Sequence, residues 1–317
     1  MRLFDAETVH KLLPYEALIP ALAKMQEGDI PSGKSVHLKD PSGADNMFVT
    51  LPGWLSDELI VVKMVGVFPQ NRERKPPLGS VLGAVSAFDA KTGAPVLVAD
   101  GEAMTYRKTA AISGLGAAQL APPNPRNLLI VGAGGLAPHV AMAHIAARPS
   151  IQRVHIWNRT VSNANALATR LNEQGIDAQV SLSLNSAVAE ADVISCVTMS
   201  DQPLVKGALL KPGSHLDLVG SYLPHMRETD DDAMRRGSVY TCCDRGREDV
   251  GELTMPMASG ALHMADIKGD SFDLAQGRSP GRASPEEITV FKNIGGAHQD
   301  VFTTAILKKK CETLGNR

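Results

Sequence analysis

The stretch that most constrains the fold runs from Leu128 to Ala137, where a short apolar run leads through a glycine turn into a helix-forming segment. The turn has the form Gly-x-Gly-x-x-Ala, with its two glycines at Gly132 and Gly134. In dinucleotide-binding βαβ units, the first glycine makes the tight turn and the second lets the backbone approach a pyrophosphate. The helix N-terminus adds N–H groups and a positive dipole end, which anions favour. Glycine turns after strands are common, so the stretch alone leaves a purely structural role open.

The segment after the expected second strand points to a particular dinucleotide. Residues 153–157 form a β-rich run that ends in Asn158, Arg159 and Thr160. When the cofactor is NAD, an acidic residue is expected there to bind the ribose hydroxyls, and this chain has none. A guanidinium instead matches a 2′-phosphate with a bidentate fork. The sequence therefore predicts NADPH, with NADH less favoured, unless Arg159 is only a solvated loop residue.

Length and charge restrict the class of protein. The chain has 317 residues, a hydrophobic fraction of 44% and a formal net charge of −2 at pH 7. This length predicts two domains or one large α/β domain, and the charge argues against nucleic acid or an anionic membrane as main partner. No apolar run approaches the roughly 18 residues of a membrane span, and no signal-peptide pattern is present, so we expect a cytoplasmic location. The four cysteines lack metal-site spacing, and no metal is expected.

The N-terminal part of the chain has a mixed pattern. Residues 1–28 predict a short strand and an amphipathic helix capped by Asp5, with a risk of a kink at Pro14. Residues 34–101 alternate short β-rich runs with turn residues, which predicts an antiparallel meander without helical crossovers. An alanine-rich helix is expected over residues 104–120.

The pattern changes after the proline-rich segment 121–125, where strands and helices begin to alternate. This alternation predicts a doubly wound parallel sheet of the Rossmann type. A final helix over residues 298–309 could return to the first domain. We therefore expect an α+β substrate-binding and dimerisation domain of residues 1–121 with 296–317, and a dinucleotide-binding domain of residues 122–295.

Several further motifs coincide in chain order with the glycine turn. They are Val62–Asn71 (VKMVGVFPQN), Phe88–Pro95 (FDAKTGAP), Met104–Ala111 (MTYRKTAA), Val219–Tyr222 (VGSY) and Thr289–Gly295 (TVFKNIG). Together they closely resemble the ornithine cyclodeaminase/mu-crystallin family, over essentially the whole chain. The resemblance implies a homodimer, in which the N-terminal α+β domain, joined by the C-terminal helix, forms the dimer and substrate platform beside the Rossmann domain.

The family includes ornithine cyclodeaminases, alanine dehydrogenases, reductases of cyclic imino acids and the mu-crystallins. In the cyclodeaminases, an aspartate after the fourth Rossmann strand handles the substrate's side-chain amine, and the matching residue here is Tyr222. A cationic ammonium needs an anionic partner in a partly dry pocket, whereas a neutral cyclic imine does not. The run from Gly220 to Glu228 (GSYLPHMRE) looks more like the imino-acid and ketimine reductases.

The resemblance also assigns the substrate contacts. Lys63 resembles the family's carboxylate-binding lysine and is the leading candidate to protonate the imine nitrogen, because desolvation lowers the pKa of a lysine. Without the family, strand alternation could equally direct Lys63 to solvent. Arg107 resembles the second carboxylate-binding residue, and Lys34 lies one position away from the third. Tyr222 and Ile294 complete the expected substrate set.

The cofactor contacts are expected mainly in the turns that follow the Rossmann strands. The full set is Ser80, Thr109, Gly132, Gly134, Gly135, Leu136, Asn158, Arg159, Thr160, Thr198, Val219, Gly220, Ser221, Asn293 and Gly295. Leu136 is expected to contribute only its backbone. Lys108 is expected to be solvated, and His298 and Asp300 are expected to be helix-start groups rather than catalysts.

The reaction expected from these features is NADPH-dependent reduction of a cyclic imino acid. Hydride from nicotinamide C4 would reach the C=N carbon of Δ1-pyrroline-2-carboxylate or Δ1-piperideine-2-carboxylate, giving L-proline or L-pipecolate. The proton for the nitrogen would come from Lys63 or from an ordered water, or the substrate would bind already protonated as an iminium. The alternatives are an ornithine cyclodeaminase, an alanine dehydrogenase-like enzyme, and a mu-crystallin-like protein that binds NADPH and a small ligand without turnover.

Overall fold

The computed structural model describes residues 1–76 and 78–315, which fall into two compact units. The first unit is Met1–Lys108 with Gly295–Arg317, and the second unit is Thr109–Ile294. The helix α3 (Gly101–Leu120) contains the point of division. The sequence instead places the domain boundary after residue 121, beyond the end of this helix, and that placement stays a prediction.

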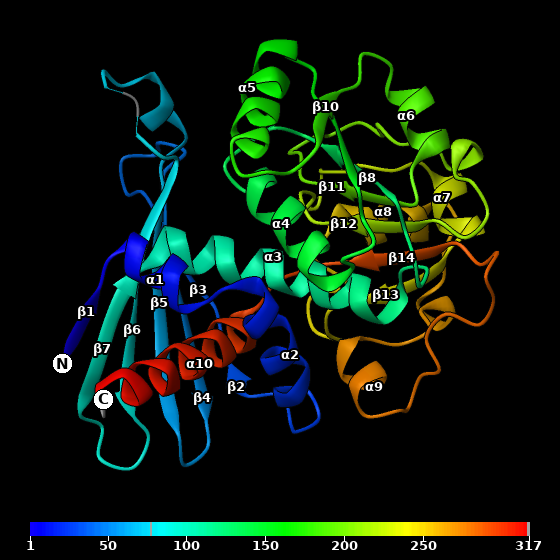
Figure 1. Ribbon diagram of the computed structural model, residues 1–317. Coiled ribbons are helices and arrows are strands. Elements are labelled where there is room, and N and C mark those ends of the chain that lie inside the picture. Colours follow the sequence, from blue (N-terminus) through cyan, green and yellow to red (C-terminus); the bar gives the residue numbers. More distant parts are fainter. Residues whose placement is uncertain (77, 316–317) are drawn as a thin grey trace. The chain divides into compact units, whose positions relative to one another are not determined.

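The first unit is built on a mainly antiparallel sheet (Figure 1). The seven strands assigned among the described residues are β1 (Arg2–Phe4), β2 (Ser32–Gly33), β3 (Val36–Lys39), β4 (Met47–Leu55), β5 (Leu59–Val67), β6 (Val81–Asp89) and β7 (Pro95–Asp100). They lie in the order β1-β7-β6-β5-β4, and both β2 and β3 pair with β4. The expected meander is confirmed, and β1 adds one parallel pairing at the edge beside β7.

Three helices pack on one face of this sheet or on one another: α1 (Ala6–Leu12), α2 (Tyr15–Met25) and α10 (Ala297–Gly315). Asp5 caps α1 as predicted, since its Oδ1 accepts from the Thr8 amide at 2.9 Å. The single helix expected over residues 1–28 is two helices, because Pro14 adopts an extended conformation between them. The last helix is longer than predicted and contacts β4 and β5.

The two faces of the sheet differ in burial. Along β5, Val61, Lys63 and Val65 are buried, while the residues between them are half-buried. The alternative in which strand alternation directs Lys63 to solvent is therefore wrong, because its side chain lies on the face that α10 covers.

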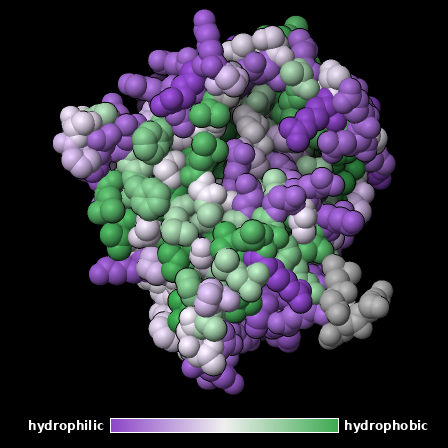
Figure 2. Space-filling model, turned by 90° about the vertical axis from the view of Figure 1, so that its left-hand side faces the viewer, coloured by the Kyte–Doolittle hydropathy of each residue, from purple (hydrophilic) through white to green (hydrophobic). Residues whose placement is uncertain are grey.

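The opposite face of the sheet carries apolar side chains that stay exposed. They include Val36 and Leu38 on β3, Phe48 and Trp54 on β4, and Leu82 on β6. The strand register places Leu38, Phe48 and Leu82 in one row across the sheet. In Figure 2, hydrophobic residues gather in a broad patch on the left of the view. Monomeric proteins rarely expose apolar patches that extend over a whole sheet face.

The second unit is a parallel sheet with helices around it, which confirms the doubly wound α/β prediction (Figure 1). Its strand order is β10-β9-β8-β11-β12-β14-β13. The strands are β8 (Asn127–Val131), β9 (Arg153–Trp157), β10 (Ala178–Val180), β11 (Val193–Cys196), β12 (His215–Leu218), β13 (Ser238–Thr241) and β14 (Thr289–Lys292). The helices besides α3 are α4 (Ala137–Ala147), α5 (Val161–Asn172), α6 (Leu184–Glu190), α7 (Asp231–Arg236), α8 (Gly251–Ala258) and α9 (Ser271–Ala275).

The strands in the middle of this sheet are buried over their whole length. The strands β11, β12 and β14 have no exposed residue, as expected for a parallel sheet whose two faces are both covered. The strand order reverses at β8, because the chain first builds outward to β10 and then continues with β11 on the other side of β8. In such sheets, ligands bind at the carboxyl ends of the strands at this reversal. Within the described residues, no helix is long and apolar enough to cross a membrane.

Candidate functional site

The glycine turn lies at the reversal of the second unit's sheet. Gly132 follows β8 with a φ of 114°, and its amide donates to the Trp157 carbonyl at 2.8 Å. A Cβ at this position would lie 3.1 Å from the Val197 carbonyl oxygen, after the neighbouring strand β11. Both the backbone conformation and the close approach therefore require glycine here.

The surface above the turn is open. A Cβ added at Gly134 would have no heavy atom within 4 Å, and α4 begins without a side-chain cap at Leu136. The Ala137 side chain is fully buried, as expected for the small residue that brings the helix close to the sheet. An uncapped helix N-terminus beside an open glycine turn is suited to an anionic group.

The loop after β9 presents one free cation. Arg159 is exposed, and it makes no hydrogen bond or ion pair with the residues that the structure describes. Asn158 fixes the loop through its Nδ2, which donates to the Thr160 carbonyl at 2.9 Å. The guanidinium of Arg159 is therefore available to an anion.

The turns after β11 and β12 approach each other very closely. A Cβ at Gly220 would lie 1.7 Å from the Thr198 carbonyl oxygen, so no other residue fits without moving the backbone. The carboxylate of Glu228 joins the two turns: it accepts from the Thr198 amide at 2.6 Å, the Thr198 hydroxyl at 2.7 Å and the Gly220 amide at 2.9 Å.

A second buried carboxylate, Glu252, lies next to the first. It accepts from the Ser221 hydroxyl at 2.8 Å, the Glu228 amide at 2.6 Å and the Thr229 amide at 3.0 Å. Lys292 donates to the same Ser221 hydroxyl at 3.1 Å and to the Leu218 carbonyl at 3.2 Å. We call Glu228, Glu252, Ser221 and Lys292 the carboxylate cluster.

Charge and burial shift the ionisation of this cluster. Burial, reinforced by the neighbouring charge of Glu252, raises the pKa of Glu228 to about 7. Burial lowers the pKa of Lys292, and both carboxylates oppose that effect. The sequence analysis assigns no role to any of the three charged residues, although Glu228 and Lys292 lie within its motifs and Lys292 is unusual in the apolar run of β14. Because the Ser221 hydroxyl is used inside the cluster, only its backbone is left for a cofactor.

The loop after β14 is tied to α3. The Asn293 amide nitrogen donates to the Thr109 carbonyl at 3.0 Å and to the Ser113 hydroxyl at 3.1 Å. The Ile294 amide donates to the Cys242 sulfur at 3.2 Å, and Gly295 has a φ of 88°.

Two further predicted positions follow β12. The Val219 amide donates to the Cys196 carbonyl at 2.9 Å. Tyr222 is 48% exposed, so the position at which cyclodeaminases carry aspartate is a solvent-facing phenol.

The first unit contains a separate group of charges on three elements. Asp300 of α10 lies between two lysines: its Oδ1 is 3.6 Å from Nζ of Lys63 on β5, and its Oδ2 is 3.0 Å from Nζ of Lys108 on α3. We call these three residues the lysine–aspartate cluster. The expectation that Lys108 is solvated is wrong, because it is only 6% exposed and its ammonium needs the buried carboxylate as a partner.

Two members of the lysine–aspartate cluster, Lys63 and Asp300, have shifted pKa values. Burial lowers the pKa of Lys63 to about 8, the charge of Asp300 opposes this, and the charge of Lys108 adds to it. Burial raises the pKa of Asp300, but the two lysines outweigh it and leave that pKa below its ordinary value. Asp300 does lie in the first turn of α10, as expected, but its role as the lysines' partner is not visible in the sequence.

The other predicted residues of the first unit lie around different contacts. Arg107 donates from Nε to Nδ1 of His10 at 2.9 Å and stacks 4.4 Å above the Tyr15 ring. Lys34 is exposed just after β2, and Ser80 is half-buried just before β6. Over residues 1–76 and 78–315, no hydrogen bond or ion pair joins Arg107, Lys34 or Ser80 to the lysine–aspartate cluster.

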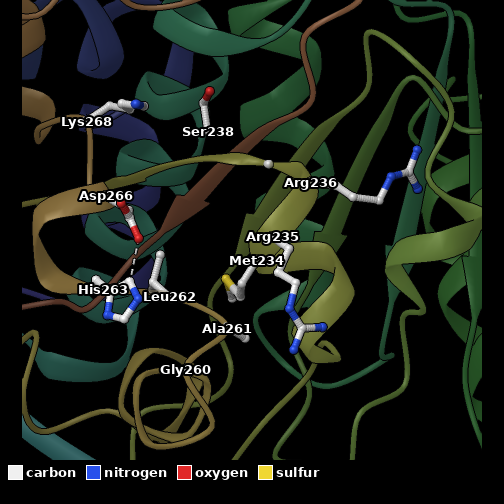
Figure 3. Close-up of a pocket in the computed structure, with 11 residues that line it drawn as sticks. Met234, Arg235, Arg236, Ser238, Gly260, Ala261, Leu262, His263, Asp266 and Lys268 are labelled. Carbon is white, nitrogen blue, oxygen red and sulfur yellow. Dashed lines mark hydrogen bonds between the residues drawn. The ribbon is translucent and has the colours of Figure 1, made fainter.

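A pocket of about 410 Å³ lies elsewhere in the second unit (Figure 3). Residues of α7, β13 and the segment 260–268 line it, and none belongs to the predicted site. The polar groups of its wall are partly engaged within the protein: Arg236 donates to the Leu210 carbonyl at 3.0 Å, and Asp266 accepts from the His263 amide at 2.8 Å. The pocket therefore lies apart from the predicted dinucleotide site at the strand ends.

Comparison with known proteins identifies the family. Residues 5–313 match the model of the ornithine cyclodeaminase/mu-crystallin family. Protein SAR DEFICIENT 4 of Arabidopsis thaliana is 39% identical over 264 residues, which cover 81% of each chain. The Delta(1)-pyrroline-2-carboxylate reductase of Paracoccus denitrificans is 37% identical over 280 residues, which cover 87% of this chain and 86% of the relative.

A solved structure is similar over nearly the whole length. It is the Delta(1)-pyrroline-2-carboxylate reductase of Thermococcus litoralis in complex with NADH and L-proline, with a TM-score of 0.92 and 25% identity. The match covers 99% of this chain and 98% of that one. The protein belongs to the ornithine cyclodeaminase/mu-crystallin family.

Proposed function

We propose that this protein reduces a cyclic imino acid, Δ1-pyrroline-2-carboxylate or Δ1-piperideine-2-carboxylate, with a nicotinamide cofactor to give L-proline or L-pipecolate. The observation that carries the proposal is the lysine–aspartate cluster, in which two buried lysines share a single carboxylate. The names of the relatives support it, since one relative at 37% identity is a Delta(1)-pyrroline-2-carboxylate reductase and the similar solved structure holds NADH and L-proline.

The charge balance of the cluster favours a carboxylate ligand. With both lysines protonated, Lys63 and Lys108 exceed the charge of Asp300 by one unit in a nearly dry environment. An uncompensated charge there is costly, and a substrate carboxylate would neutralise it. Arg107, held by His10 and Tyr15, provides a further cation suited to a bidentate carboxylate contact.

The chemistry assigns a task to each unit. A nicotinamide dinucleotide, when bound, supplies the hydride that reaches the imine carbon. The open turn at Gly132 and Gly134 and the uncapped start of α4 fit its pyrophosphate. Lys63 donates a proton to the imine nitrogen, so the C=N bond becomes CH–NH and Lys63 then recovers a proton from solvent. Tyr222 carries no charge for a second amine, which argues against cyclodeamination of ornithine.

NADPH is the preferred cofactor in this proposal, because Arg159 is a free cation after β9 and no acidic residue stands beside it. Arg159→Asp should lower the ratio of kcat/KM for NADPH to that for NADH by about 100-fold, since a charge-assisted contact is worth roughly 1.5–3 kcal/mol. Arg170→Asp, an exposed position on α5, is the matched control. An unchanged ratio in Arg159→Asp would exclude this role.

A homodimer formed through the exposed apolar face of the first unit's sheet is part of the same proposal. Phe48, Trp54 and Leu82 lie on that face and are exposed in the single chain. Double substitution of Phe48 and Trp54 by Glu should convert a dimer to a monomer in analytical ultracentrifugation, because each chain would bring two charges into the interface. Leu182→Glu, at an exposed apolar residue of the second unit, should leave the dimer intact.

The reaction itself is tested with a panel of substrates. The purified protein is given each cyclic imine with NADPH or NADH, pyruvate with ammonia and NADH, and L-ornithine with NAD. Oxidation of NADPH with either imine, at a rate well above the other pairs, is the expected result. Release of ammonia from ornithine would favour a cyclodeaminase, and turnover of pyruvate with ammonia would favour an alanine dehydrogenase. NADPH binding without any turnover would favour a mu-crystallin-like binding protein.

A further inference from the structure

We propose that Asp300 is a positioning residue that keeps Lys63 protonated for the reaction, that Lys108 opposes it, and that the two together set the alkaline limit of imine reduction. The inference rests on the proposed function, in which Lys63 donates the proton. It adds a role for two residues that do not themselves transfer hydride or proton.

The two oxygens of the Asp300 carboxylate have different surroundings. Asp300 Oδ2 accepts a hydrogen bond from Lys108 at 3.0 Å. Asp300 Oδ1 is buried and has no hydrogen-bond partner among the residues described, and Lys63 Nζ is 3.6 Å away from it. The two oxygens thus face different lysines. The oxygen nearer Lys63 can still accept a hydrogen bond.

All three residues of the lysine–aspartate cluster are buried. Lys63 is 5% exposed, Lys108 is 6% exposed and Asp300 is 1% exposed. Interactions between charges are stronger in such surroundings than at the surface, because little water screens them. Removing one charge from this cluster should therefore change the proton affinity of the others by much more than an exposed charge would.

Few other charges face Lys63 among the residues described. Its cross-strand neighbours on β4 and β6 are Leu51 and Val85, which carry none. From α10 it meets Asp300, which raises its pKa, and from α3 it meets Lys108, which lowers it. His298, in the first turn of α10, acts on Asp300 and lowers the pKa of that carboxyl.

These opposing neighbours predict opposite effects on the pH profile. A general acid must be protonated to act, so kcat/KM falls as the pH rises through its pKa. Asp300→Asn removes the favourable charge and should move this alkaline limb to lower pH by about one unit. Lys108→Met removes the unfavourable charge and should move the limb to higher pH. A merely structural role for the two residues would not produce shifts of opposite sign.

The experiment measures kcat/KM for Δ1-pyrroline-2-carboxylate at saturating NADPH between pH 6 and pH 10, in wild type, Asp300→Asn, Asp300→Glu and Lys108→Met. Asp300→Glu keeps the charge and should restore the wild-type limb. Asp45→Asn, an exposed carboxyl in the same unit, should leave the limb unmoved. If the alkaline limb of the pH profile stays in place in Asp300→Asn and Lys108→Met, or moves in the same direction in both, the inference is overturned while the proposed reaction stands.

For variants with too little activity for kinetics, the protonation of Lys63 can be measured directly by an NMR titration. The protein is labelled with lysine carrying 13C at Cε, and the Lys63 signal is identified by its absence from Lys63→Met. The midpoint of this signal should be lower in Asp300→Asn than in wild type and higher in Lys108→Met. If wild type reduces no cyclic imine, the proposed function fails. If instead the midpoints do not separate, the inference fails.

Discussion

The two units both bury carboxylates beside lysine, and they satisfy them to different degrees. In the carboxylate cluster, both oxygens of Glu228 and of Glu252 accept hydrogen bonds, mainly from backbone amides and hydroxyls. In the lysine–aspartate cluster, Asp300 Oδ1 accepts none from the described residues, and its distance to Lys63 exceeds that of a hydrogen bond.

This difference in hydrogen bonding distinguishes a cluster with a structural role from one that is suited to bind a ligand. A buried charge with all its hydrogen bonds made holds the surrounding backbone in one conformation. A buried charge with hydrogen bonds unmade is unfavourable in the free protein and becomes favourable when a ligand completes it. By this criterion, the carboxylate cluster shapes the turns after β11 and β12. In the lysine–aspartate cluster, the Lys63 ammonium makes no hydrogen bond with the residues described, and in the proposed function the substrate carboxylate would accept one from it.

The largest expected effect is on stability, at Glu252. Glu252→Ala removes the acceptor of the Glu228 amide, the Thr229 amide and the Ser221 hydroxyl at once. Breaking a buried network by removing one charged partner costs about 3–5 kcal/mol, so the thermal midpoint should fall by many degrees. Thermal unfolding followed by circular dichroism measures this. Glu248→Ala, four residues earlier and exposed, should change it little, and equal losses in both variants would contradict the comparison.

The next effect is on activity, at Lys63 and Arg107. Lys63→Met and Arg107→Ala should each lower kcat/KM for the imine about 100- to 1000-fold, equivalent to roughly 3–4 kcal/mol of transition-state stabilisation. In contrast to Glu252→Ala, Lys63→Met should not lower the thermal midpoint, because a methionine fills the space of a lysine that is poorly paired in the free protein. Steady-state kinetics and thermal unfolding of the same preparations measure both quantities. A kcat/KM near the wild-type value in both variants would show that Lys63 and Arg107 are not part of the substrate site.

The smallest effect is a pH dependence of stability. The pKa of Lys63 is lowered to about 8 in the folded protein, from an ordinary value of 10.5. Above pH 8 the unfolded chain therefore binds this proton more strongly than the folded chain, and stability rises with pH in that window. Between pH 8 and pH 10, wild type should gain on the order of 2 kcal/mol relative to Lys63→Met.

Urea unfolding at the two pH values measures this difference, and the comparison with Lys63→Met cancels the titration of all other groups. Lys24→Met, at an exposed lysine, should show no such difference. A wild type that loses stability relative to Lys63→Met over this window would mean that folding raises the pKa of Lys63 above its ordinary value and does not lower it.

The features that can be predicted from the sequence depend on local patterns. The glycine turn, the parallel sheet that follows it and the meander before it all produce short-range periodicity, and each is found where expected. The sequence predicts only a risk of a kink at Pro14, whereas the structure has two separate helices there. Proline lacks the amide donor that a continuous helix needs, but this alone does not tell whether the helix bends or ends. Lys63 is recognisable because its motif is specific, although alternation within a strand cannot tell which face a helix will cover.

The partners within each cluster are not predictable in the same way. Lys108 and Asp300 are 192 residues apart, and although apolar residues follow each of them, nothing in the sequence indicates that their charges pair. Glu228 lies in a run of acidic and polar residues, Arg227 to Asp232, which is typical of a solvated segment. Its carboxylate is needed because the turns after β11 and β12 lie close together and both direct an amide toward it. This closeness results from the pairing of β11 with β12 in the sheet and is not visible in the local sequence.

The position of α10 within the first unit also determines the order in which the protein can be completed during synthesis. Asp300 follows Lys108 by 192 residues, so at a rate of ~5–20 residues per second it is made roughly 10–40 s later. By then the ribosome has synthesised all of the second unit, while the first sheet still lacks the helix that covers β4 and β5. Lys63 and Lys108 spend this interval without their counter-ion. The unit that contains Lys63 and Lys108 is thus closed only after the second unit has been synthesised.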